Sequence, residues 1–98
     1  MPAYKAPVRD IRFLMNEVFD YPAHYQTLST GENADADTIN MIIDGAADFC
    51  ENVLSPLNQS GDEEGSHFKD GEVTTPKGFK EAYDQFVQGG WQGLSYPE

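Results

Sequence analysis

The residues of this 98-residue chain that could carry chemistry are one cysteine, two histidines and 17 carboxylates. A nucleophilic cysteine needs a base beside it, and nothing in the sequence places His24 or His67 near Cys50. Cys50 falls on the apolar side of an expected helix, which predicts a buried and unreactive thiol. A zinc site needs four ligands at suitable spacing, and no such set occurs. We therefore expect both histidines to be structural or exposed.

Alternating carboxylates suggest a calcium loop, which the rest of the pattern rejects. Asn33, Asp35 and Asp37 match the first three ligand positions of an EF-hand. That loop also needs glycine at its sixth position and glutamate at its twelfth, where Thr38 and Asp44 stand. We expect Asp35 or Asp37 to cap the following helix instead, because carboxylates meet free N–H groups and the positive end of the dipole there.

Composition narrows the classes of partner without naming a reaction. Six basic against 17 acidic residues give a net charge of −11, which disfavours binding to nucleic acid or to anionic membrane surfaces. The glycines form neither GxGxxG nor a P-loop. A lone cysteine rules out an intramolecular disulfide and favours a reducing compartment, so we expect a cytoplasmic location. We assign no catalytic, cofactor-binding or metal-binding residue.

Apolar periodicity predicts three helices in one small all-α domain. The first covers residues 7–20, and Tyr21-Pro22 ends its pattern. The second begins at Asp35 or Asp37 and closes at Ser55-Pro56. The third begins at Thr75 as cap with Pro76 in its first turn, and Gly89-Gly90 stops it.

The intervening segments carry turn and loop signals. Residues 21–28 are rich in aromatic side chains, with His24 packed among tyrosines, and residues 29–33 and 58–65 are expected loops. Asp70-Gly71 between short extended pieces predicts a hairpin within residues 68–74. Because an isolated hairpin is only marginally stable in water, we expect this hairpin to pack against the helices.

Beyond these patterns, six stretches in fixed order resemble the extra N-terminal segment of a subgroup of bacterial acyl-CoA dehydrogenases. The resemblance covers nearly the whole chain. The stretches are YKAPVRDIRF at residues 4–13, FCE at 49–51, LSPLN at 54–58, SGDEEG at 60–65, DGEVTTPKGF at 70–79 and GGW at 89–91.

The resemblance implies a flavin enzyme of which residues 1–98 are only the leading helices. Members of that family use a glutamate base and FAD to dehydrogenate acyl-CoA thioesters, with medium, long or sulfur-containing acyl groups within the subgroup. The β-domain and the C-terminal helical bundle that hold the flavin and the base would follow this segment. Pro97-Glu98 has the character of an interrupted segment. We carry no catalytic role onto Glu51, Glu72 or Glu81.

The resemblance has one consequence for the isolated chain, and the sequence leaves other interpretations open. Its apolar stripes would lack the helices that cover them in the whole enzyme, so we expect a homo-oligomer. The alternative is a free-standing acidic interaction module, because residues 14–67 contain eleven acidic residues and no lysine or arginine. A small-ligand carrier has no polar cluster in the sequence to support it.

Overall fold

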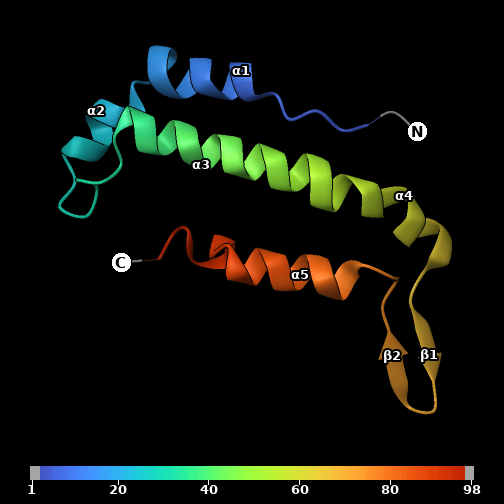
Figure 1. Cartoon of the computed structure of the whole chain (residues 1–98). Helices are drawn as coiled ribbons and strands as arrows, with labels where there is room; N and C mark the ends of the chain where they lie inside the picture. The colour runs from blue at the N-terminus through green and yellow to red at the C-terminus, as the bar shows by residue number, and fades with distance from the viewer. Residues whose placement is uncertain (1–2, 97–98) are drawn as a thin grey trace.

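A computed structural model describes residues 3–96, in which the helices lie side by side in a single layer (Figure 1). A long central helix, formed by α3, η2 and α4, has α1 and η1 along one side and antiparallel α5 along the other. The molecule measures 54 × 32 × 16 Å. A helix with its side chains is about 10–12 Å across, so the layer is little more than one helix thick.

The first helix is confirmed, but it changes from an α-helix to a π-helix part-way along, which the sequence did not predict. It runs as α1 from Val8–Arg12 and continues as the π-helix η1, Phe13–Val18. The aromatic segment that follows is also helical, as α2, Tyr21–Gln26. Asp20 caps α2 by accepting the N–H of Ala23 at 3.4 Å. Tyr21-Pro22 therefore opens a new helix after the first one has ended.

The second helix begins as expected but does not end as expected. Asp35 caps α3, Ala36–Phe49, which continues through the π-helix η2, Cys50–Leu54, into α4, Ser55–Glu64. The predicted stop at Ser55-Pro56 and the predicted loop at residues 58–65 are both wrong. A π-turn shifts the bonding to i→i+5, and proline is tolerated in the first turn that follows. The helix ends at Gly65, where φ is +71°.

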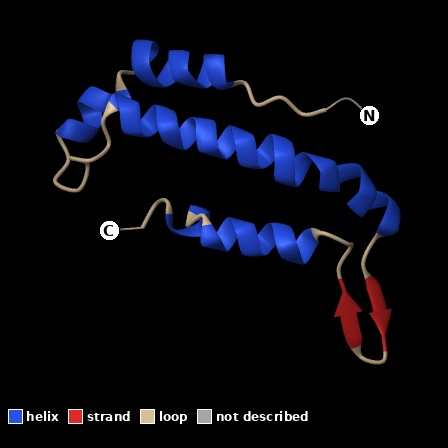
Figure 2. Ribbon diagram, viewed as in Figure 1, coloured by secondary structure: helices blue, strands red, loops and turns tan. Residues whose placement is uncertain are grey.

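The hairpin is confirmed, but the expected packing of its strands against the helices is not. Strand β1, His67–Lys69, pairs with β2, Glu72–Thr74, and Phe68 lies opposite Val73. Both residues of the Asp70-Gly71 turn have positive φ, as a type I′ turn requires. All six strand residues are exposed, and the hairpin projects beyond the end of the layer (Figure 2). The expectation that the hairpin packs against the helices is wrong.

The third helix is α5, Phe79–Gln88. Thr75 is not its cap, because Gly78 adopts a left-handed conformation with φ +88° and the helix begins after it. Pro76 lies before the helix, and its carbonyl accepts the N–H of Phe79. The predicted stop at Gly89-Gly90 is confirmed, and a short 3-10 helix, η3, Trp91–Gly93, follows.

This all-α layer with one hairpin confirms the predicted fold class, but its core is thin. The buried apolar residues of the described chain are Ile39, Ala47 and Ala82. The radius of gyration is 17.4 Å, whereas a compact domain of this length has about 13 Å. The accessible surface is 7690 Å², against about 5,600 Å² for a compact monomer of this mass. Among residues 3–96, no helix is both long and apolar enough to cross a membrane.

Candidate functional site

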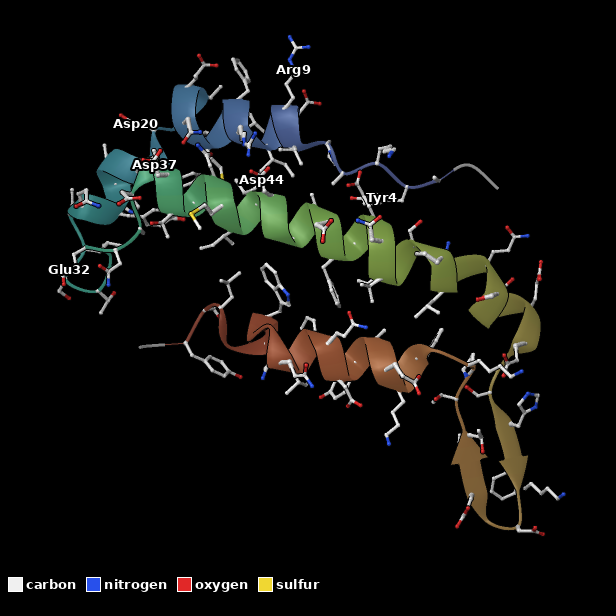
Figure 3. All side chains as sticks on the ribbon, viewed as in Figure 1. Tyr4, Arg9, Asp20, Glu32, Asp37 and Asp44 are labelled. Carbon is white, nitrogen blue, oxygen red and sulfur yellow. The ribbon has the colours of Figure 1, made fainter. Side chains whose placement is uncertain are left out.

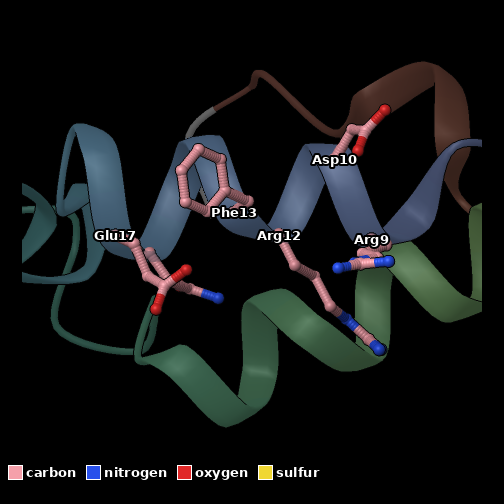
Figure 4. Close-up of a pocket in the computed structure, with 6 residues that line it drawn as sticks. Arg9, Asp10, Arg12, Phe13 and Glu17 are labelled. Atoms are coloured by element: carbon pink, nitrogen blue, oxygen red, sulfur yellow. The ribbon is translucent and has the colours of Figure 1, made fainter.

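A surface hollow of about 870 Å³ lies along α1 and η1 (Figure 4). Two arginines and two carboxylates line it, so their charges balance. Such a hollow does not select an anion by charge, and one of its arginines, Arg12, pairs with Asp44 of α3. The lining residues are Arg9, Asp10, Arg12, Phe13, Asn16 and Glu17.

The side chain of Arg12, at the edge of the hollow, extends toward α3 (Figure 4). Its guanidinium forms an ion pair with Asp44 and donates to the carbonyl of Asn40 at 3.5 Å. Asn16 adds a hydrogen bond from its amide nitrogen to the Asn40 side-chain oxygen at 3.3 Å. The Arg12 and Asp44 side chains are 36% and 62% exposed. These contacts join η1 and α1 to the central helix through polar groups.

The segment before α1 is tied to the same helix in the same manner. The Tyr4 N–H donates to Ser55 Oγ at 3.3 Å, and the Ala6 N–H donates to Glu51 Oε1 at 3.2 Å. Tyr4 lies beside the far half of the central helix in Figure 3. Glu51 therefore orders the N-terminal segment, which gives this carboxylate a structural role.

The opposite side of the central helix is held by aromatic packing. The Phe49 and Phe86 rings lie 6.3 Å apart between centroids, and Trp91 packs on Gly45. Phe79 lies directly on the backbone at Gly61, where a Cβ atom would come within 2.5 Å of its ring. A Cβ atom at Gly45 would meet Trp91 at an ordinary 3.6 Å, so the tight packing against a glycine lies at Gly61.

The sequence-level candidates for chemistry lie on separate elements. His24 on α2 stands among Tyr21 and Tyr25, with ring centroids 6.4 and 5.9 Å away, as expected. His67 begins the exposed strand β1, and Cys50 begins η2, half-buried rather than fully buried. Within residues 3–96, no three histidine, cysteine or acidic residues gather in a way that could hold a metal ion.

Asp35 performs the capping role that the sequence predicted. Its carboxylate accepts the backbone N–H of Thr38 at 2.8 Å. This hydrogen bond, with help from the Thr38 hydroxyl, lowers the pKa of Asp35 below its ordinary value of 3.8. Asp37 lies in the first turn of the same helix, where a negative charge meets the positive end of the dipole.

Comparison with known proteins finds a relative that is much longer than this chain. No family model matches the sequence. The chain is 39% identical, over 94 residues, to a 3-methylmercaptopropionyl-CoA dehydrogenase of Ruegeria pomeroyi. The resemblance to an acyl-CoA dehydrogenase is confirmed. The match covers 96% of this chain and 16% of that dehydrogenase, so the chain is similar to a small part of such an enzyme.

Helix N-termini can bind the pyrophosphate of a dinucleotide through their free N–H groups, but at α3 the Asp35 carboxylate already accepts the N–H of Thr38. Helix α4 continues from η2, and α5 carries Glu81 in its first turn. Glu72 and Glu81 are exposed, and neither lines the hollow along α1 and η1.

Proposed function

We propose that residues 1–98 are the N-terminal helical segment of a FAD-dependent acyl-CoA dehydrogenase, inert by themselves. The observation that carries this proposal is the 39% identity across nearly the whole chain to a small part of one such dehydrogenase. The segment's contribution is structural, since Arg12, Glu51 and the Phe49–Phe86 ring pair are engaged in contacts between its own elements.

The reaction of the whole protein is the α,β-dehydrogenation of an acyl-CoA thioester. The relative is named for 3-methylmercaptopropionyl-CoA, which makes a thioester of coenzyme A the proposed class of substrate for this protein too. The flavin and the glutamate base belong to the remainder of the enzyme chain. The acyl group that it accepts is determined by residues outside this segment.

The proposal extends to assembly and location. The exposed surface of the layer, about 2,000 Å² more than a compact monomer of this mass would show, favours homo-oligomerisation of the isolated segment. A CoA-dependent oxidation and a single cysteine suit the cytoplasm.

The test is expression of the complete natural reading frame. We expect a protein that releases flavin on denaturation and whose flavin is reduced by acyl-CoA thioesters, 3-methylmercaptopropionyl-CoA among them. Residues 1–98 alone, as the matched control, should release no flavin. A reading frame that stops after residue 98, or a longer protein without flavin, would contradict the proposal.

One observation favours a second function, that of an acidic interaction module. Residues 14–67 hold eleven carboxylates and no lysine or arginine, a distribution that attracts basic proteins. Binding of a basic protein that weakens as salt rises, together with a stop codon after residue 98, would establish this alternative.

A further inference from the structure

The chain contains two Asp-Gly sequences, Asp44-Gly45 and Asp70-Gly71. An aspartate followed by glycine is open to an intramolecular reaction, because glycine has no side chain to hinder the approach of its amide nitrogen to the aspartate carboxyl carbon. Whether the reaction occurs depends on how freely the two groups can move, and the structure holds the two sites in very different ways.

Asp44-Gly45 lies inside a helix. Both residues belong to α3, where each N–H donates to the carbonyl four residues earlier. The Asp44 carboxylate is paired with Arg12, and Figure 3 shows Asp44 on the side of α3 nearest α1. Trp91 lies over Gly45. The Gly45 amide can therefore reach the Asp44 carboxyl carbon only when this part of α3 opens and the ion pair breaks.

Asp70-Gly71 forms the tip of the hairpin, where neither group is held. Both residues are exposed, and a Cβ atom placed on Gly71 would have nothing within 4 Å. The hydrogen bond of a β-turn joins the two residues that flank the tip. Among residues 3–96, no turn or loop hydrogen bond involves the Gly71 amide nitrogen. This amide is therefore free to approach the neighbouring carboxyl group.

The strands below the tip restrain it weakly. Each strand has three residues, and the cross-strand pair of Phe68 and Val73 is 76% and 69% exposed. A two-stranded hairpin without further packing is only marginally stable, and such segments open locally at little cost in free energy. The tip thus samples many more backbone conformations than Asp44-Gly45 does.

We propose that Asp70 is a site of spontaneous isomerisation to isoaspartate and that Asp44 is protected from the same reaction. The Gly71 amide nitrogen attacks the side-chain carboxyl carbon of Asp70. A C–N bond forms, the C–O bond of the protonated carboxyl group breaks, and water leaves to give a succinimide ring. Water then adds to the ring carbonyl that came from the Asp70 backbone and breaks its bond to nitrogen. The backbone now runs through the former side chain, and the mass of the chain is unchanged.

The reaction changes the hairpin and defines a class of partner. Isoaspartate adds one carbon atom to the backbone of a two-residue turn whose length sets the strand register, so Phe68 no longer lies opposite Val73. An isoaspartate in an exposed turn is a substrate for carboxyl methyltransferases that use S-adenosylmethionine. This inference is independent of the proposed function.

The two sites within one molecule supply the test. The complete natural protein is incubated at neutral pH and digested, and peptide mapping measures isoaspartate at each site. We expect isoaspartate to accumulate at Asp70 at least about tenfold faster than at Asp44, because the helix has to open first. The matched variant is Asp70→Gly, since Gly-Gly also forms a type I′ turn. It should lose methylation by an isoaspartate-specific carboxyl methyltransferase with labelled S-adenosylmethionine.

The same incubation in concentrated urea separates structure from sequence. In the unfolded chain both aspartates precede a glycine without restraint, so the two rates should converge. Equal rates in the folded protein, or no isoaspartate at Asp70, would overturn the proposal. A difference that persists undiminished in urea would also overturn it, because the protection of Asp44 would then come from its neighbours in sequence and not from α3.

Discussion

The two sides of the central helix are held by opposite kinds of interaction. Toward α1 and η1, the contacts are an ion pair and hydrogen bonds centred on Arg12, Asn40 and Asp44. Toward α5, they are aromatic rings packed on one another and on glycine backbone, as with Phe49 and Phe86. Exposed ion pairs contribute little to the free energy of unfolding and are screened by salt, whereas the burial of apolar side chains contributes more. We therefore expect α5 to be the firmly held neighbour and α1 the weakly held one.

The largest expected effect is on the aromatic side. Phe86→Ala removes the ring that meets Phe49 and should lower the free energy of unfolding by about 2–3 kcal/mol, since the ring is half-buried. Urea denaturation of the chain at low concentration measures it. The control is Phe13→Ala, which removes an exposed ring and should cost less than about 0.5 kcal/mol. Equal losses would show that the aromatic contact does not hold α5.

Glycine substitutions sharpen the comparison along the same side. In Gly61→Ala, the new methyl group would clash with the Phe79 ring, and we expect a loss of about 1–3 kcal/mol in unfolding free energy. Gly45→Ala meets Trp91 at an ordinary contact distance of 3.6 Å and should gain up to about 1 kcal/mol from helix propensity. Thermal unfolding followed by circular dichroism separates the two. Similar midpoints would contradict the packing of Phe79 on α4.

On the polar side, Asp44→Asn removes the charge that pairs with Arg12. The expected loss is about 0.5–1 kcal/mol at low salt, and it should vanish near 1 M salt, where the Debye length falls to about 3 Å. The exposed Asp84 on α5 supplies the control variant, Asp84→Asn. A loss that persists at high salt would mean that this side depends on more than charge.

The smallest effect concerns the start of α3. Because the pKa of Asp35 is lowered in the folded chain, its carboxylate stabilises the fold above the ordinary value of 3.8, and this contribution fades as pH falls through the lowered pKa. Asparagine caps helices as well as aspartate but does not titrate. Asp35→Asn should therefore keep the helix at neutral pH and flatten the loss of helicity below about pH 4. An unchanged acid profile would assign the pH dependence to other carboxylates.

The elements that local chemistry specifies were predictable. The Asp35 cap, the Asp70-Gly71 turn and the Gly89-Gly90 stop each depend on a few adjacent residues. The continuation of the helix through Pro56 was not predictable. It depends on the π-helix η2, which directly precedes the turn that contains the proline. Helix α2 was missed although Asp20 and Pro22 are a cap and a first-turn residue.

The arrangement in space was less accessible from the sequence. Arg12 meets Asp44 across 32 residues, and no periodicity selects that partner among so many carboxylates. The apolar stripes predicted that faces would lack partners, but a stripe does not specify how helices lie side by side. The single layer became visible only in the structure.

The central proposal is that residues 1–98 alone self-associate, because a single layer of helices leaves a large surface exposed. Light scattering of residues 1–98 over a range of concentrations tests it most directly. We predict a mass that rises above the 10.9 kDa of the monomer with concentration, and more steeply at high salt, where the repulsion between copies is screened. A sharp monomer peak at every concentration and salt would contradict the account.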